Sequence, residues 1–391
     1  MKATSLIILI LLSFMSCDKK TQDTDSSTFY EVPPNKTILP NDIKINNITT
    51  DTISIDTNIE TSFVGQFSIF NNKIYFFDEV FGYTYRFTKK GALIDRNMGK
   101  GRGPNEIPRF DYAIASENGH YFLNAGNSTV SIYDNSFKKE KDFTINNPTE
   151  RPVKEVMENP MSSMFDAYEF DYGIPNAFQL WDKEHFAISI TASHPKFNGY
   201  FNSDLYYNHS RILAIVNINS GNIIDLIGRR SPFYLSHQNL PNFDHFNYQI
   251  NQNEVYISFW ADGIIYVLDK KSGLAVNKFG VEGRDMQTDY MTTLTYEAAE
   301  RNWRKDMENY GYYNYLKYLP NKQLLFRGYS KGNDALMDGL QIYKDYKLIG
   351  DIDVFKGLEI IGEIDDYIYA VNSKSQSNNL EVYKLKLDYE N

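Results

Sequence analysis

Residues 252–273, QNEVYISFWADGIIYVLDKKSG, carry the pattern that decides the fold. The polar pair Gln252-Asn253 precedes Glu254–Phe259, where apolar and aromatic residues gather, and Ile264–Asp269 repeats that composition after a short polar loop. Lys271-Ser272-Gly273 then supplies a second tight turn. Runs of β-branched and aromatic residues bounded by turn residues predict antiparallel strands joined by hairpins.

The same four-strand rhythm recurs along the chain. Second strands are expected at Lys73–Phe77, His120–Asn124, His185–Thr191, Glu254–Phe259, Gln323–Gly328 and Tyr367–Val371. Third strands are expected at Tyr83–Phe87, Thr129–Tyr133, Arg211–Asn217, Ile264–Asp269, Gly339–Tyr343 and Leu380–Leu385. A recurring unit of four strands, about 40–50 residues long without its insertions, is typical of a propeller blade.

This repeat predicts an all-β fold, a six-bladed β-propeller of four-stranded antiparallel blades that covers residues 43–391. The last unit has three strands, so Ile43–Ile48 or Thr52–Ile55 is expected to supply the fourth and close the ring. Closure is needed because an open array would leave an unpaired strand edge. A jelly roll or two stacked β-sandwiches is the alternative, although sandwich strands would not recur in this fixed order.

Composition narrows the class of protein. The 391 residues include 50 Asp plus Glu against 40 Lys plus Arg, and the formal net charge is −10. Such an acidic balance argues against general binding to nucleic acid, which needs a basic surface. Aromatic residues make up 15% of the chain, which favours strands over disorder. A single cysteine, Cys17, excludes a disulfide framework and a zinc site built from cysteines.

The first residues have the pattern of an export signal. Met1-Lys2 is followed by an apolar run from Leu6 to Leu12 that is too short to span a bilayer, and Cys17 stands where cleavage would fall. We expect residues 1–16 to be a signal peptide, Cys17 to become a lipidated first residue, and residues 17–42 to form a flexible tether. An ordinary cleaved signal with an incidental cysteine is the alternative.

The chain resembles the six-bladed β-propeller lipoproteins of bacteria, many of which are domains of unknown function. The resemblance rests on Cys17, on the blade rhythm, on Met98-Gly99-Lys100-Gly101-Arg102-Gly103-Pro104-Asn105-Glu106 after the first blade, and on residues 310–327. It implies a propeller held at the bacterial cell envelope by a lipid anchor, at the outer membrane or the cell surface. It implies no activity and no catalytic residues.

Three long segments interrupt the rhythm: Asn146–Asn176, Ala192–Ser210 and Gly280–Tyr313. Strands of a blade run from the axis outward, so all three are expected on one face, where long loops on a rigid scaffold concentrate function. In the third, Leu294, Ala298 and Trp303 recur at helical spacing within Thr292–Tyr310, which predicts an amphipathic helix between blades four and five. It is expected to pack on the propeller, with a lid as the alternative.

Six residues are candidates for ligand binding on this face. Arg102, Arg229, Arg230 and Arg284 follow glycines in connections that could lead to the channel mouth, where guanidinium groups would bind a carboxylate or phosphate. The structural alternative is that each arginine pairs with an acidic residue of a neighbouring blade and that the glycine supplies a positive φ. Trp260 and Trp303 are expected on the same face, where aromatic rings hold sugars or peptide side chains.

No catalytic motif is present. The chain has no Gly-x-Ser-x-Gly and no His-Glu-x-x-His, its six histidines show no ligand spacing, and Gly99–Gly103 lies in an all-β context rather than before a helix. We therefore expect no cofactor, no metal and no catalytic residue. A His/Asp site assembled in space stays open as an alternative.

These observations predict a cell-envelope lipoprotein without catalysis that binds a glycan, a peptide or an envelope protein on its insertion-bearing face. It would contact the membrane through its lipid anchor alone and would not bind nucleic acid. The alternative is a propeller lyase or hydrolase that acts on a polysaccharide or peptide at the same channel mouth. Two carboxylates with perturbed pKa values in a deep pocket would favour catalysis. A structural subunit of an outer-membrane assembly is a third reading.

Overall fold

The computed structural model describes residues 24–34, 43–55, 59–147, 151–174, 176–200, 203–237, 239–374 and 379–389. The signal peptide and Cys17 lie outside these ranges, as does most of the expected tether. In the described part of the chain, no helix has the length and apolar character needed to cross a membrane.

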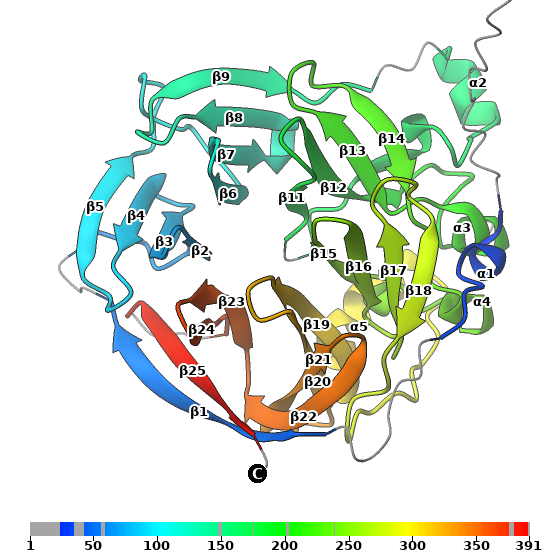
Figure 1. The fold of residues 1–391 in the computed structure, drawn as a ribbon. Helices are drawn as coiled ribbons and strands as arrows, with labels where there is room; N and C mark the ends of the chain where they lie inside the picture. Colours follow the sequence, from blue (N-terminus) through cyan, green and yellow to red (C-terminus); the bar gives the residue numbers. More distant parts are fainter. Residues whose placement is uncertain are drawn as a thin grey trace, which may run out of the picture.

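Within the described residues, five sheets surround a central axis (Figure 1). Four of them are separate. They consist of β2 (Gly65–Phe70), β3 (Lys73–Asp78), β4 (Tyr83–Phe87) and β5 (Leu93–Met98); β6 (Tyr112–Ser116), β7 (Gly119–Asn124), β8 (Thr129–Tyr133) and β9 (Lys139–Thr144); β10 (Tyr168–Phe170), β11 (Phe178–Leu180), β12 (His185–Ala192), β13 (Leu213–Asn217) and β14 (Ile223–Ile227); and β15 (Phe246–Ile250), β16 (Glu254–Phe259), β17 (Ile265–Asp269) and β18 (Ala275–Phe279).

The fifth sheet has eight strands and joins both ends of the chain. Its order is β19 (Tyr310–Leu319), β20 (Leu324–Gly332), β21 (Met337–Lys344), β22 (Lys347–Phe355), β1 (Ile45–Ser54), β25 (Glu381–Tyr389), β24 (Tyr367–Asn372) and β23 (Leu358–Ile364). β1 pairs antiparallel with β25 from Ile45↔Tyr389 to Ser54↔Glu381. The predicted closure of the ring by an N-terminal strand is therefore confirmed.

The prediction of six separate sheets is not met. β1 also forms a parallel pair with β22 at the one residue pair Ile45↔Gly350, so the last two sets of four strands form one continuous sheet. This happens because the N-terminal strand is the outermost strand of the last set and continues far enough to reach the outermost strand of the set before it. The structure thus has four separate sheets and one eight-stranded sheet in a propeller-like ring.

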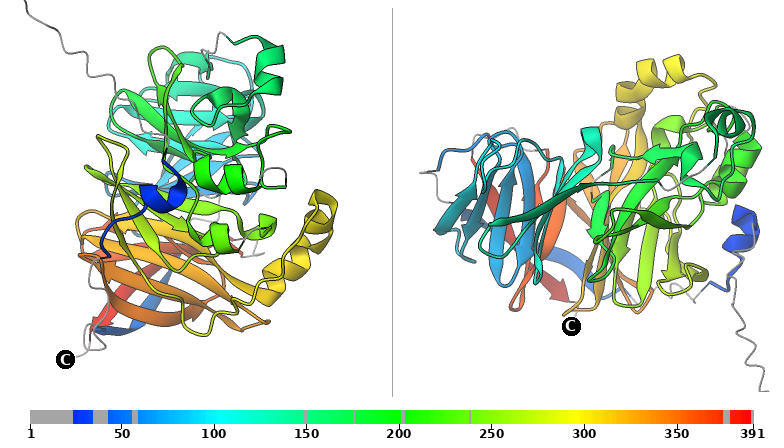
Figure 2. Two further views of the ribbon diagram at one scale, coloured as in Figure 1. Left: turned by 90° about the vertical axis from the view of Figure 1, so that its right-hand side faces the viewer. Right: turned by 90° about the horizontal axis from the view of Figure 1, so that it is seen from above.

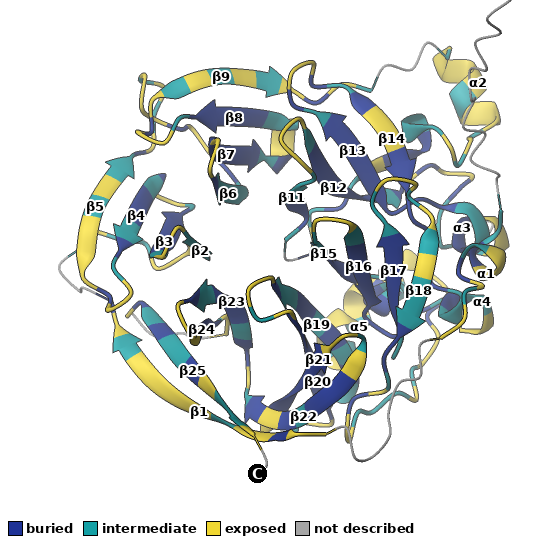
Figure 3. Ribbon diagram, viewed as in Figure 1, coloured by how far each residue is buried: buried dark blue, intermediate teal, exposed yellow. Residues whose placement is uncertain are grey.

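How far a strand is buried depends on its position between the axis and the outer edge of the ring. The second strand of each set is almost wholly buried, as in β3 and β20, whereas the outermost strands β1, β5 and β9 expose many of their residues (Figure 3). The apolar side chains between neighbouring sheets form the core, for example Phe76 and Tyr85 of the first sheet with Ile361 and Tyr369 of the eight-stranded sheet. The predicted hairpin glycines Gly91, Gly221 and Gly273 all have positive φ.

Five helices accompany the sheets within the described residues: α1 (Ser26–Phe29), α2 (Val153–Glu158), α3 (Ser203–His209), α4 (Phe233–Ser236) and α5 (Tyr296–Asn309). The helix expected within Thr292–Tyr310 is α5, and the side chain of its N-cap, Thr295, accepts a hydrogen bond from the amide of Ala298. In the edge-on view of Figure 2, α5 rises from one face, and α2 and α3 lie on the same side but toward the rim. The insertions therefore do not encircle the channel mouth.

Part of the expected tether is packed, which corrects that prediction. The hydroxyl of Tyr30 donates to the carbonyl of Arg229 (2.7 Å), its ring lies 4.1 Å from that of Tyr266, and its side chain is 1% exposed. Ser26 also bonds to the backbone of Tyr207. A stretch with few apolar residues is ordered here because one aromatic anchor and a short helix supply enough contacts.

Replacing Tyr30 with Ser is expected to release this segment from the rim, because it removes a buried ring and its hydrogen bond at a cost of roughly 3–5 kcal/mol locally. Limited proteolysis should then cut near residues 24–34 in the variant but not in the wild type. Tyr389→Ser, the same change at a tyrosine that is 58% exposed at the end of β25, serves as the matched control. Equal protease resistance of Tyr30→Ser and wild type would contradict a docked segment.

Candidate functional site

A cavity of about 580 Å³ lies at one end of the axial channel. Glu79 lines it from the β3–β4 connection, and Asn372, Ser373 and Asn379 line it from the β24–β25 connection. Both connections join second to third strands, as does the segment between β12 and β13 that contains α3. The cavity therefore opens on the insertion-bearing face.

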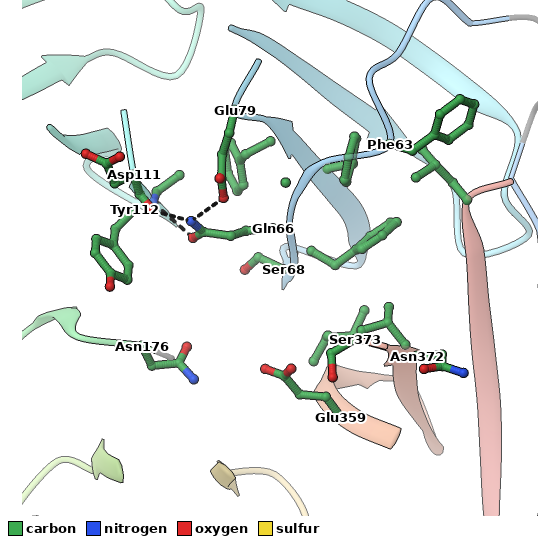
Figure 4. Close-up of a pocket in the computed structure, with 18 of the residues that line it drawn as sticks. Phe63, Gln66, Ser68, Glu79, Asp111, Tyr112, Asn176, Glu359, Asn372 and Ser373 are labelled. Carbon is green, nitrogen blue, oxygen red and sulfur yellow. Dashed lines mark hydrogen bonds between the residues drawn. The ribbon is translucent and has the colours of Figure 1, made fainter. Parts of the chain in front are cut away.

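The lining is acidic and rich in amides and hydroxyls. Glu79 and Gln66 face Glu359 and Asn176 across the cavity (Figure 4). Four carboxylates, four side-chain amides and several hydroxyls line it, and the described lining residues include neither lysine nor arginine. The polar members are Glu79, Asp111, Glu359, Glu381; Gln66, Asn176, Asn372, Asn379; Ser68, Ser373, Tyr112, Tyr172. Such a surface attracts cations and repels anions.

Gln66 on β2 positions the acidic side of the cavity. Its side-chain amide donates to Glu79 Oε1 (2.9 Å) and to the carbonyl of Asp111 (2.5 Å), and its Oε1 accepts from the amide of Ala113 (3.3 Å). It therefore joins the first sheet to the second at the cavity wall. Burial raises the pKa of Glu79 and the nearby Asp111 carboxylate raises it further, while the hydrogen bond from Gln66 lowers it.

Asp111 already has partners for both of its oxygens. Arg109 lies 2.7 Å from its Oδ1 and the amide of Ala125 donates to its Oδ2 (2.7 Å). The Arg109 side chain is itself largely exposed, so this surface pair contributes little to stability. Because Asp111 is already paired with Arg109, Glu79 is the carboxylate on this side of the cavity that has no cationic hydrogen-bond partner among the described residues.

Glu359 at the start of β23 supplies the opposite wall. Burial raises the pKa of this carboxyl, and the ammonium of Lys317 on β19 partly counteracts the rise. The same burial lowers the pKa of Lys317, against the effect of Glu359. The two groups come from the innermost strands of neighbouring strand sets in the eight-stranded sheet, so only the closed ring brings them together.

The predicted arginine ring at the mouth does not form. Arg229 and Arg230 are 0% and 1% exposed and neither lines the cavity. Arg230 forms an ion pair with Asp244 at 3.0 Å and also donates to Thr191 Oγ1 (3.1 Å). Arg229 lies under the N-terminal segment, with Phe29 beside its guanidinium at 5.6 Å. The ion pair of Arg230 and the positive φ of Gly228 agree with the structural alternative.

The other two arginines are at the surface and also away from the cavity. Arg284 pairs with Asp353 at 2.7 Å, an acidic residue of β22. Arg102 is exposed and takes part in no ion pair with the described residues. A role of Arg102 in ligand binding stays a prediction, but four guanidinium groups do not converge on one ligand.

The two tryptophans do come together. Trp260 is 7% exposed and Trp303 on α5 is 41% exposed, with ring centroids 6.4 Å apart. The His245 ring is 4.7 Å from that of Trp260 and 6.1 Å from that of Trp303, and Tyr312 stacks on Trp260 at 5.0 Å. This aromatic cluster is next to the cavity, since a Cβ on the lining residue Gly173 would lie 4.0 Å from the His245 ring. The cluster itself does not line the cavity.

The described residues contain no group of three His, Cys, Asp or Glu side chains able to hold a metal ion. His245 Nδ1 and Asp171 Oδ2 are 3.9 Å apart, which is too long for a hydrogen bond. Burial raises the pKa of Asp171, but His245 beside it holds that pKa below its usual value. This His–acid pair is therefore an electrostatic neighbour of the cavity rather than an assembled acid–base dyad.

Sequence reasoning missed Glu79, Gln66 and Glu359. One signal was present: Glu79 follows the second strand of its set, in a type of connection already assigned to the insertion-bearing face. Gln66 and Glu359 belong to first strands, whose polar residues can face the axis, but nothing in the sequence showed which side chains of which sheets would meet.

Fold and cavity together define a propeller-like protein with an acidic recess at its axis. No family model matches the chain, and neither does any curated protein. The structure is similar to that of a DUF4221 family member from Bacteroides vulgatus, with a TM-score of 0.62 and 11% identity over 89% of this chain and 98% of that one. It is also similar to a Bacteroides fragilis protein described as exported, with a TM-score of 0.50 and 14% identity over 87% of this chain and 95% of that one. These similarities show the fold.

Proposed function

We propose that this protein is a lipid-anchored, extracytoplasmic binding propeller that receives a cationic group of its ligand in the acidic cavity, without catalysis. The eight-stranded sheet counts as two blades, β19–β22 and β23–β25 with β1, so the propeller has six. Cys17 is the anchor and residues 1–16 are the export signal.

The observation that carries the proposal is the charge of the cavity. Four carboxylates line about 580 Å³ and none of the described lining residues is basic, so an amine or guanidinium that enters can pair with Glu79. The amides and hydroxyls around them can bond to further polar groups of a sugar or a peptide. An anionic ligand is not favoured here, which replaces the earlier expectation of a carboxylate or phosphate.

An export signal at the N-terminus supports the extracytoplasmic location, and a structurally similar protein is described as exported. The lone cysteine at the expected cleavage site supports the lipid anchor. Radiolabelled palmitate should be incorporated into the wild-type chain in a bacterial host and not into Cys17→Ala.

The alternative function is hydrolysis or elimination on a polysaccharide or peptide. Its specific support is that Glu79 and Glu359 both have pKa values raised by burial in one cavity, as an acid–base pair would need. Binding is preferred because Gln66 hydrogen-bonds to Glu79 and the charge of Lys317 acts on Glu359. Neither carboxylate is therefore assigned as a nucleophile or as a group that activates water.

Glu79→Gln is expected to weaken binding of an arginine or lysine peptide by roughly 10–100-fold, because one charge-assisted contact contributes about 1.5–3 kcal/mol. Isothermal titration calorimetry with tri-arginine, tri-lysine and chitosan trimer measures this. Glu117→Gln, an exposed carboxylate on the opposite face, is the control and should bind as wild type. Equal affinity for the chitosan trimer and its N-acetylated form would contradict a cationic ligand. Cleavage of either trimer into shorter sugars would favour the alternative function as a hydrolase or lyase.

The pH dependence of binding and stability should have opposite signs. The pKa of Glu79 is raised in the folded chain. As the pH is lowered, cation binding should therefore begin to weaken at a pH above the ordinary pKa of a glutamate. Stability responds the other way: the unfavourable burial of the ionised carboxylate is absent below the unfolded pKa and grows as pH rises through the folded pKa. Glu79→Gln should remove part of both effects, as titration calorimetry and melting curves at pH 5 to 8 would show.

A further inference from the structure

Four apolar side chains are exposed together at the edge of the cavity. Phe63 and Val64, before β2, are 42% and 52% exposed, and Val80 and Phe81, in the β3–β4 connection, are 41% and 36% exposed. The amide of Glu79 donates to the carbonyl of Val64 (3.1 Å), so the two loops lie side by side. We call these four residues the apolar rim. Phe63 also lines the cavity, so the rim adjoins the cavity wall at this residue (Figure 4).

A buried carboxylate holds both loops in place. Asp78 is 0% exposed, and its oxygens accept hydrogen bonds from the Ser62 amide (2.7 Å) and hydroxyl (2.7 Å) and from the amides of Val80 (3.1 Å) and Phe81 (2.8 Å). Thr61 Oγ1 donates to it as well (2.9 Å). Since one anchored side chain bonds to both loops, the rim is presented as a fixed surface rather than as a fluctuating one.

Phe63 itself adopts a backbone conformation that is costly for a bulky residue. Its φ is +62°, a left-handed value that glycine adopts easily and phenylalanine rarely. The side chain gains little burial in return, since it is 42% exposed. Strain of this kind without a packing benefit is often found where a side chain contacts a ligand.

We propose that the apolar rim is the second half of the ligand site, and that the ligand is a protein segment in which a lysine or arginine stands next to large apolar residues. This inference rests on the proposed function, because the basic side chain is the group that enters the acidic cavity. The neighbouring apolar side chain then covers Val64, Val80 and the two phenylalanine rings.

A peptide suits this surface better than a sugar does. Sugars stack on flat aromatic faces, whereas half of the rim is branched aliphatic side chain, which favours leucine-like groups through loss of water contact. Charge complementarity selects the same occupant: the cavity attracts the basic group and the uncharged rim takes the apolar one. Recognition of a partner protein by such a segment also suits a rigid scaffold with a preformed recess.

The test compares two peptides, acetyl-Leu-Lys-Leu-amide and acetyl-Gly-Lys-Gly-amide, on the wild-type chain and on Val64→Ser/Val80→Ser by titration calorimetry. Wild type should bind the leucine peptide about tenfold more tightly, and the double variant should lose that difference while its affinity for the glycine peptide is unchanged. Val276→Ser, on the outer strand β18 and 49% exposed, is the matched control and should keep the difference.

A second variant separates binding from folding. Phe63→Gly fits the positive φ, so its melting temperature should equal or exceed that of wild type, while its affinity for the leucine peptide should fall severalfold. Equal affinities of wild type for the two peptides would overturn the rim proposal, as would a leucine preference that survives Val64→Ser/Val80→Ser. Binding of the chitosan trimer but of neither peptide would overturn it too, while the proposal that the acidic cavity binds a cation would stand. If Glu79→Gln also changed nothing, the proposed function would fail with it.

Discussion

A chain that begins at Ile59 is expected to lose cooperative folding, whereas one that begins at Ile43 is expected to keep it. The residues that only the longer chain has include β1, which pairs with β25 along its whole length and contacts β22 at Ile45↔Gly350. Without it, β25 would present an unpaired edge and the ring would open between its two ends. Ile45 and Ile55, which are 0% and 2% exposed, would also be lost from the core.

The expected size of the effect follows from these losses. Removing two buried isoleucines costs roughly 2–5 kcal/mol each, and the sum is comparable to the 5–15 kcal/mol that stabilises a whole domain. Differential scanning calorimetry should show one cooperative transition for the chain from Ile43 and none for the chain from Ile59, which should also elute as aggregate in size-exclusion chromatography. A sharp transition and a monomeric peak for the shorter chain would show that closure by β1 is dispensable.

Arg230→Ala is expected to destabilise the fold by about 3–5 kcal/mol, because it leaves Asp244 buried without its cation. Arg230 is 1% exposed, and its guanidinium bonds to the Asp244 carboxylate (3.0 Å) and carbonyl (2.8 Å). Burial already raises the pKa of Asp244 and Arg230 opposes the rise, so the variant should bind a proton at Asp244 more readily. For a domain of this size the melting temperature should fall by roughly 4–7 °C.

Arg102→Ala is the matched control, since it is the same change at an exposed arginine of the same sequence pattern. Its melting temperature should stay within the error of wild type. Adding Asp244→Asn to Arg230→Ala should restore part of the lost stability, because no buried charge then remains. Similar melting temperatures for Arg230→Ala and Arg102→Ala would mean that the buried ion pair contributes nothing and would reopen a ligand-binding role for Arg230.

The strand pattern was largely predictable from the sequence. Tyr83–Phe87, Thr129–Tyr133 and Glu254–Phe259 coincide with β4, β8 and β16, and the helix expected within Thr292–Tyr310 is α5. These elements are set by the alternation of apolar residues and by turn residues close by in the chain. The pairing of an N-terminal strand with β25 was also predictable, since three strands at the C-terminus needed a fourth.

The arginines show where pattern reasoning failed. Arg102, Arg229 and Arg284 share a preceding glycine, but Gly228 alone among those three glycines has a positive φ. That turn sends the chain into the core, where Arg229 and Arg230 are buried, while Arg102 stays at the surface. The same Gly-Arg dipeptide thus occurs once in the core and elsewhere at the surface, because burial of the arginine depends on which residues of the neighbouring sheet lie opposite it.

The sequence by itself determined the all-β class, the fourfold strand rhythm, the closure of the ring and the helical insertion, because each depends on residues that are neighbours in the chain or on the need to pair a strand edge. The tertiary structure alone decided that β1 joins two strand sets into one sheet, that Tyr30 docks the N-terminal segment, and that Glu79, Glu359 and Phe63 line one cavity. Those features depend on how far each sheet is rotated about the axis, and local sequence does not encode that rotation.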